Sequence, residues 1–379
     1  MTERERFRTR GMFYYTTNDY AACVKEYSDL VARFAGDAAA RNNLALCSTK
    51  LRDMRKAREE MQRVVQILPK RSLYRVNAAL YSVYASNFEA GEQEARVAQE
   101  LQDPWALQAL ALAQQGQGKT AEAIQSYQAL ASVQGAGASY TTSGLGDVAL
   151  YEGRFADAAS LFADGAKADL GAKDGDRAAY KQAALALTEL ARGRPRQARA
   201  AAEQAMANGA GVLQVRFLAG RVFAQAGAIP QARAIAAKLS AELQAESQAY
   251  GQIIEGVIAL ERKDARTAVK LLTEATALLD TWIGRFDLGR AYLAAGAYPQ
   301  ADSEFDRCLK RQGEALSLFL DEEPTSGFLP PVHYYQGRVR EAMGTGAFAE
   351  SYQRYLAIRG NATGDPLVAD IRRRAAAAR

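Results

Sequence analysis

The chain has 379 residues, which exceeds one ordinary globular domain and indicates either two domains or one extended array. Apolar residues make up 49% and charged residues 24%, a balance typical of a folded chain with a buried core and not of a disordered one. The net charge of +5 is small for this length, and the clearest basic clusters, at residues 4–10 and 372–374, are short and terminal. We therefore expect no nucleic-acid partner. No stretch approaches the roughly 20 apolar residues of a membrane helix, so we expect no membrane insertion.

A repeated pattern runs along the chain. In the segment at residues 153–158, a glycine is followed two positions later by a large apolar residue and three further on by an alanine; the segments that begin at Gly227 and Gly296 repeat it. Most of the spacings between the equivalent small positions lie close to 34 residues, which is the period of the tetratricopeptide repeat. These positions are Cys23, Ala57, Gly91, Ala123, Ala158, Ala198, Ala232, Ala268, Ala301 and Ser351.

Two further positions keep the same phase. Glycines recur inside the first helix of the expected pairs, at residues 11, 146, 220, 256, 289 and 337, and large residues recur inside the second helix, among them Tyr27, Met61, Phe162, Leu272 and Phe305. We therefore predict an all-α fold: a right-handed superhelical solenoid of about ten tetratricopeptide-like helix-turn-helix repeats with a C-terminal capping helix. Such pairs stack because none can bury its apolar face alone. First helices should line the concave side and second helices the convex side.

In chain order, residues 1–134 form repeats 1–4 and residues 135–312 form repeats 5–9. Residues 135–137 (Gly-Ala-Gly) form the weakest joint between these two ranges. An inserted loop at 313–331 is too long for a plain turn, so it either lies across the groove or caps the stack. The last repeat and the cap occupy residues 332–379, with the capping helix starting near Leu367.

The sequence offers no set of residues that suits catalysis, a metal or a cofactor. Cys23, Cys47 and Cys308 are too few and too scattered for a disulfide framework or a zinc site, and His333 is the only histidine. Residues 113–120 loosely match a phosphate-binding loop, but helical spacing precedes them where that motif needs a strand. We expect a non-enzyme without metal or cofactor. Because the sequence shows neither a signal peptide nor a membrane segment, we also expect a cytoplasmic location.

The candidate binding residues lie where first helices face the groove. An aromatic residue and an arginine one turn later recur as Phe217 with Arg221, Phe286 with Arg290, and Tyr334 with Arg338. Arginine can bind a carboxylate while the ring holds an apolar side chain, which suggests an acidic, partly apolar peptide; the alternative is that these arginines are merely solvated. Further candidates are tyrosines that contact a peptide or equally fill space between repeats: Tyr84, Tyr140, Tyr151, Tyr180 and Tyr250.

Four segments resemble a particular family. They are residues 2–11, residues 289–292 with 301–305, residues 319–325 and residues 334–338. They make the chain similar to the tetratricopeptide-rich C-terminal region of bacterial eukaryotic-like serine/threonine protein kinases. The resemblance implies a sensory or scaffolding tail, associated with or attached to a kinase domain whose own motifs this chain lacks. We expect a protein-interaction scaffold or sensory module, or alternatively a regulatory tail of such a kinase or a similar signalling protein that senses a small ligand. The partner is expected to be a protein or peptide.

Overall fold

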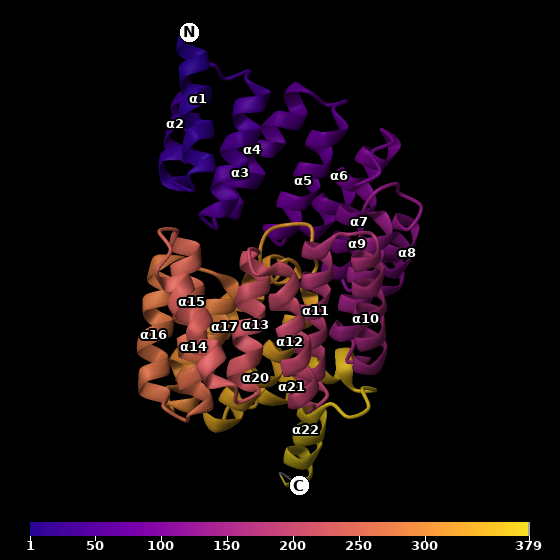
Figure 1. The fold of residues 1–379 in the computed structure, drawn as a ribbon, viewed down its shortest axis with the longest axis vertical. Coiled ribbons are helices and arrows are strands. Elements are labelled where there is room, and N and C mark those ends of the chain that lie inside the picture. Colours follow the sequence, from indigo (N-terminus) through magenta and orange to yellow (C-terminus); the bar gives the residue numbers. More distant parts are fainter. Residues whose placement is uncertain (378–379) are drawn as a thin grey trace. The chain divides into compact units, whose positions relative to one another are not determined.

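The computed structural model describes residues 1–377, and this part of the chain contains 22 α-helices, one 3-10 helix and no β-strand (Figure 1). The expected all-α solenoid of about ten helix pairs is confirmed. The chain divides into two compact units. Unit 1 comprises residues 1–133 and 311–322, and unit 2 comprises residues 134–310 and the chain from residue 323 onward. Residues 378 and 379, which end the predicted range 332–379, lie outside the described residues.

Unit 1 contains four helix pairs and one short helix from much later in the chain. In order, the helices are α1 (Glu3–Thr16), α2 (Tyr20–Arg33), α3 (Ala38–Lys50), α4 (Met54–Ile67), α5 (Ser72–Tyr84), α6 (Phe88–Glu100), α7 (Ala106–Gly116), α8 (Thr120–Leu130) and α19 (Gln312–Leu316).

Unit 2 contains six helix pairs, a 3-10 helix and a final helix. They are α9 (Gly137–Tyr151), α10 (Phe155–Gly171), α11 (Gly175–Ala191), α12 (Pro195–Gly209), α13 (Leu213–Gln225), α14 (Ile229–Ser240), α15 (Ala245–Glu261), α16 (Ala265–Leu278), α17 (Trp282–Ala294), α18 (Tyr298–Lys310), η1 (Ser326–Phe328), α20 (Pro330–Ala342), α21 (Phe348–Arg359) and α22 (Pro366–Ala377).

The turn inside every pair contains one residue with a left-handed backbone conformation. At six turns this residue is glycine, as at Gly153 (φ +77°) and Gly296 (φ +75°), where the missing Cβ makes the conformation inexpensive. At the other four turns the left-handed residue is not glycine but Asn18, Arg52, Ser86 or Lys263. Glycine therefore marks only six of these ten turns.

The first and second helices of a pair touch where glycine meets a large side chain. A Cβ added to Gly289 would lie 2.7 Å from the ring of Phe305, and one added to Gly146 would lie 2.7 Å from the ring of Phe162. Gly11 meets Tyr27 and Gly256 meets Leu272 in the same way. These contacts confirm the glycine-to-large pairing expected from the sequence and explain why the two positions keep one phase. In the last pair, Gly337 meets the ring of Tyr352.

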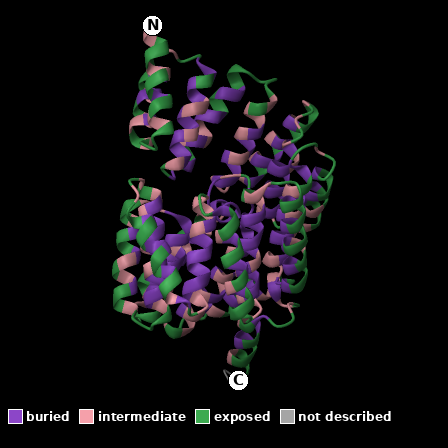
Figure 2. Cartoon of the chain, viewed as in Figure 1, coloured by how far each residue is buried: buried purple, intermediate pink, exposed green. Residues whose placement is uncertain are grey.

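First helices form the inner layer of each unit. Successive first helices contact one another (α5 with α7, α11 with α13, α13 with α15), whereas no two second helices make comparable contacts within the described residues. Buried residues concentrate on the faces that helices turn toward their neighbours, while the outward faces of helices such as α14 and α16 are largely exposed (Figure 2). Within each unit, the face formed by its first helices is called the first-helix face below.

One prediction about the cysteines is wrong. Cys23 on α2 and Cys47 on α3 form a disulfide although they lie 24 residues apart in sequence. Both are buried, because the second helix of one repeat packs against the first helix of the next, and this stacking brings the two positions together. Cys308 is buried and lies outside this disulfide. None of the described helices combines the length and apolar character needed to cross a membrane.

Candidate binding site on the first-helix face

The segment that the sequence marks as an insertion lies against first helices. We call residues 312–329 the strap. In unit 1, its residues 312–322 pack on α5 and α7, and Leu316 and Leu320 join the hydrophobic core there. The Tyr84 hydroxyl donates a hydrogen bond to the main-chain oxygen of Asp321 (2.7 Å), and the Gln108 amide donates one to that of Glu322. Both bonds reach the strap's backbone and not its side chains.

In unit 2, the strap's residues 323–329 lie against α9, α11 and α20. The Tyr180 hydroxyl donates to the main-chain oxygen of Pro324 (3.2 Å). Asp147 accepts three hydrogen bonds, from the Ser326 amide (2.8 Å), the Ser326 hydroxyl (2.5 Å) and the Gly327 amide (3.1 Å). This part of the strap is again held largely through its backbone.

Asp147 is an unusual anchor because it is a buried carboxylate, only 3% exposed. Burial raises the pKa of Asp147 to about 6, although the bonds from Ser326 and Gly327 and the positive charge of Arg359 act in the opposite direction. Arg359 fixes the same region by donating to the main-chain oxygens of Leu150 (2.8 Å), Tyr151 (2.9 Å) and Gly327 (3.1 Å).

Beside this part of the strap, unit 2 has an open cavity of about 380 Å³, which we call the unit 2 cavity. That volume falls in the range of small-molecule sites. Apolar and aromatic side chains supply much of its lining, together with three arginines and two carboxylates. The lining residues are Leu150, Phe155, Leu187, Leu190, Ala191, Arg221, Gln225, Glu261, Phe286, Arg290, Gly327, Phe328, Pro331, Tyr335, Arg359, Asp365, Pro366 and Leu367.

A network of charges forms one wall of the unit 2 cavity. Asp287 is fully buried. It accepts hydrogen bonds from both terminal guanidinium nitrogens of Arg221, Nη1 and Nη2, and one from Arg290 (2.9 Å). Arg290 also lies over the rings of Phe286 (5.9 Å) and Tyr335 (5.5 Å), and Glu261 approaches it to 4.0 Å. One buried carboxylate thus serves two arginines, and Glu261 is their second, more distant counter-ion.

The three predicted aromatic–arginine pairs occupy different environments. Phe217 and Arg221 are buried, and Phe217 stacks on Tyr250 with ring centroids 4.2 Å apart. The unit 2 cavity is lined by Arg221 of this pair and by both members of the second pair, Phe286 and Arg290. Arg338 is half-buried and donates to the Tyr334 hydroxyl (3.0 Å) outside the lining of that cavity.

The five candidate tyrosines also differ in burial. Tyr84, Tyr180 and Tyr250 are buried, which favours for these three the alternative that they fill space between repeats. Burial raises the pKa of Tyr84 well above its ordinary value. Tyr140 and Tyr151 are half-buried, and Tyr140 lies under the guanidinium of Arg177 (5.2 Å). Two of the buried tyrosines, Tyr84 and Tyr180, also donate hydrogen bonds to main-chain oxygens of the strap.

Several residues of the cavity gave no signal in the sequence. Glu261 ends α15, Arg359 ends α21, and Phe328 belongs to the strap, so only the fold brings them together. Tyr335 adjoins the candidate Tyr334, but nothing in the sequence distinguishes which of the two rings faces Arg290. Burial raises the pKa of Glu261, and the charge of Asp287 adds to the effect, whereas Arg290 and Arg221 oppose it.

Two sequence features that resemble chemical motifs have structural explanations. Residues 113–120 run from α7 through a turn at Gly118 (φ +74°) into α8, so they do not follow a strand as a phosphate-binding loop would. His333 lies on α20. Burial lowers the pKa of His333 to about 4, and the charge of Arg354 lowers it further, so the imidazole is neutral at pH 7.

The basic cluster at the N-terminus is also largely paired. Arg4 and Arg8 both contact Asp37, at 2.8 and 2.7 Å, and Arg10 contacts Glu26 at 2.6 Å.

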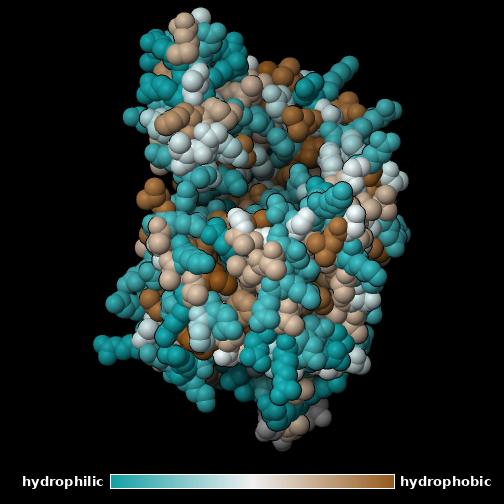
Figure 3. Space-filling view, in the orientation of Figure 1, coloured by the Kyte–Doolittle hydropathy of each residue, from teal (hydrophilic) through white to brown (hydrophobic). Residues whose placement is uncertain are grey.

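Across the face shown in Figure 3, hydrophilic residues predominate and apolar residues are scattered.

Comparisons with known proteins agree with the repeat architecture. Residues 9–72 and 183–246 match a family model described as "Tetratricopeptide repeat". These matches and the ten helix pairs identify tetratricopeptide-like repeats. No curated protein matches the sequence.

Several solved structures are similar to the chain. A human IFIT1 dimer with m7Gppp-AAAA is 14% identical, with a TM-score of 0.48 over 93% of this chain and 80% of that one. A tetratricopeptide repeat protein from Parabacteroides merdae is 12% identical, with a TM-score of 0.48 over 68% of this chain and 98% of that one. Yeast Tom70 is 11% identical, with a TM-score of 0.38 over 94% and 85% of the two chains.

Proposed function

We propose that this chain is a non-catalytic protein-interaction module whose first-helix face holds an extended segment of a partner protein. The observation that supports the proposal is the strap. Tyr84, Gln108 and Tyr180 all donate to main-chain oxygens of the strap, and Asp147 accepts from its main-chain amides. A face that binds its own chain through the backbone has the chemistry to bind an extended segment of another protein.

The partner segment is acidic and partly apolar in this proposal. Arg290 and Arg338 are the two arginines of the predicted pairs that are not fully buried, and each lies over an aromatic ring. Phe286 and Tyr334 are the rings beneath these two arginines, and Arg221 shares Asp287 with Arg290. In this proposal Phe217, Tyr140 and Tyr151 extend the contact surface. A protein is a better partner than a nucleic acid because the N-terminal arginines already have carboxylate partners.

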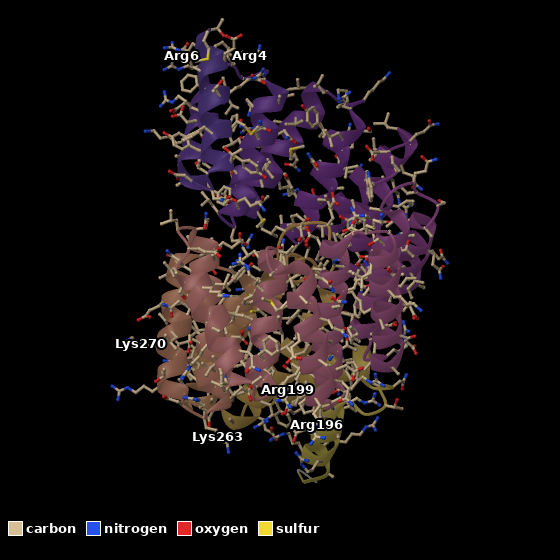
Figure 4. All side chains as sticks on the ribbon, in the orientation of Figure 1. Arg4, Arg6, Arg196, Arg199, Lys263 and Lys270 are labelled. Atoms are coloured by element: carbon tan, nitrogen blue, oxygen red, sulfur yellow. A yellow bond between two sulfur atoms is a disulfide. The ribbon has the colours of Figure 1, made fainter. Side chains whose placement is uncertain are left out.

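The test measures binding of a captured partner to two matched double variants. A partner captured from the source cells is purified, and its Kd is measured for the unmodified chain, for Arg290→Met with Arg338→Met, and for Arg196→Met with Arg199→Met. The control arginines lie on α12, a second helix (Figure 4). We expect binding to weaken at least about tenfold for the first variant only. If both double variants weaken partner binding equally, or if neither weakens it, the proposed binding face is contradicted.

A second proposed function is a small-ligand-sensing regulatory tail of a bacterial serine/threonine kinase or a similar signalling protein. The unit 2 cavity favours its small-ligand part, because the cavity combines apolar walls with a few convergent charged groups. The kinase part follows only from the sequence resemblance. It is tested by co-purification of a kinase from the source cells, and a chain that never associates with one would contradict it.

A further inference from the structure

We propose that the unit 2 cavity binds a small organic acid, with the acid's carboxylate beside Arg290 and Arg221 and its apolar or aromatic body against the apolar side chains that line the cavity. The inference deepens the small-ligand function and rests on it. It shares Arg290 with the partner-segment function, but binding of a pure small acid is measured without any partner protein and so tests it separately.

The first argument is the charge distribution. Arg221 and Arg290 share Asp287, so one of the two positive charges needs a second counter-ion. Glu261 provides it poorly, because its contact with Arg290 is 4.0 Å long and over a third of its side chain is exposed. A ligand carboxylate placed closer to Arg290 than Glu261 would form the stronger charge-assisted bond.

The second argument is an unsatisfied donor. Arg221 is 2% exposed and lines the unit 2 cavity, yet its Nε has no hydrogen-bond partner among the described residues. A buried N–H without an acceptor costs free energy, and such groups are rare in folded proteins. Arg221 therefore keeps hydrogen-bonding capacity that Asp287 alone does not satisfy, at a residue that lines the cavity.

The third argument concerns the body of the ligand. Phe286 and Tyr335 flank Arg290, and Leu187, Leu190 and Phe328 complete an apolar wall. A purely inorganic anion would leave these side chains without contact. An acid with an aromatic or branched aliphatic body would cover them, and the volume of about 380 Å³ limits the ligand to a small molecule.

The test uses 3-phenylpropionate and its neutral analogue 3-phenylpropionamide, with calorimetry on the full chain. We expect the acid to bind with a Kd of about 1 mM or tighter and the amide at least about tenfold more weakly. Phenylethylamine, a cation of similar shape, should not bind.

Three variants separate the ligand site from a general effect on the fold. Arg290→Met should weaken acid binding at least about tenfold, whereas Glu261→Gln should strengthen it because a competing negative charge is removed. Ala191→Phe keeps every charge but adds a ring to the cavity lining, so it should weaken acid binding at least about tenfold. Arg199→Met, on α12, is the matched control and should leave the Kd unchanged. Circular dichroism checks that all four variants keep their helicity.

The outcomes distinguish this inference from the function on which it rests. Equal binding of acid and amide, or stronger binding of the amine, would overturn the choice of an organic acid while leaving a small-ligand site intact. Acid binding that survives both Arg290→Met and Ala191→Phe would overturn the location. Absence of binding by all three probes at millimolar concentration would overturn both the inference and the small-ligand function.

Discussion

At the scale of single residues, the repeat depends on glycines that let a ring from the second helix touch the backbone of the first. Gly289 is such a site, because an added Cβ would lie 2.7 Å from the Phe305 ring, which is itself fully buried. We expect Gly289→Ala to destabilise unit 2 by about 1–3 kcal/mol, since overpacking forces the ring or the helix to shift. The measurement is the urea midpoint followed by circular dichroism.

Gly171→Ala provides the control for this prediction. Gly171 is the last residue of α10 and has open space where a Cβ would be added. There the substitution reduces the freedom of the unfolded chain, and the stability should stay the same or rise by up to about 1 kcal/mol. A loss of stability at Gly171 as large as that at Gly289 would show that the ring contact is not the cause.

Asp147 predicts a dependence of stability on pH. Its folded-state pKa of about 6 lies above the unfolded value of about 4, so between these pH values the folded chain retains a proton that the unfolded chain releases. Stability from this group is therefore greatest below pH 4 and declines as the pH rises through 6. The decline amounts to on the order of 2 kcal/mol.

Asp147→Asn removes this titration. Urea midpoints between pH 4 and 7 should show a decline with pH in the unmodified chain that is absent or much smaller in the variant. The comparison cancels the contributions of other carboxylates, which both proteins share. Parallel pH curves for the two proteins would mean that Asp147 does not titrate as a buried carboxylate.

At the scale of elements, the link between α2 and α3 is covalent. The Cys23–Cys47 disulfide closes a loop of about 24 residues, and such a bond typically adds about 3 kcal/mol by restricting the unfolded chain. We expect only one of the three cysteines to react with a thiol reagent in denaturant without reductant. Reduction, or Cys23→Ser, should lower the thermal stability of unit 1.

Cys308→Ala supplies the matched control, because Cys308 lies outside the disulfide. That variant should show no reactive thiol in denaturant and should keep the response of unit 1 to reductant. Three reactive thiols in the unmodified, unreduced chain would contradict the disulfide.

Helices and their pairing are predictable from the sequence because they depend on local signals. A glycine turn, a following apolar residue and a small residue recur with one period, so each repeat supports the assignment of the next. The same reasoning fails for the turns at Asn18, Arg52, Ser86 and Lys263, where an L-residue adopts the left-handed conformation. It also fails for Cys23 and Cys47, whose contact depends on how neighbouring repeats stack.

The candidate site is predictable only in part for a related reason. Periodicity identifies Phe286 and Arg290 as neighbours on one helix, but Glu261, Phe328 and Arg359 reach the same cavity from three other elements. Likewise, the sequence shows that Arg221 stands one turn after Phe217 and cannot show that Asp287, 66 residues later, pairs with it. Such contacts depend on the curvature of the stack, which no single repeat encodes.

At the scale of the whole molecule, the order of the chain and the order of the packing differ. Leu316 follows nine repeats in sequence, yet it is 1% exposed in the hydrophobic core of unit 1, together with Tyr84 and Leu112. Unit 1 is therefore incomplete without residues 311–322. A partner that displaced the strap from this face would also expose part of the core of unit 1.

This dependence predicts a long-range effect of Leu316→Ala. Truncating a fully buried leucine costs about 2–4 kcal/mol, and here the loss should fall on α5 and α7, against which α19 packs. Hydrogen exchange should therefore accelerate in residues 72–84 and 106–116, far from the substitution in sequence. Leu278→Ala, at a position that is 40% exposed on α16, should change exchange little anywhere. A contrary result would be unchanged exchange in α5 and α7 with faster exchange in residues 312–322. The strap would then be a detachable segment and not a structural part of unit 1. A partner segment could in that case replace it without loss of stability in that unit.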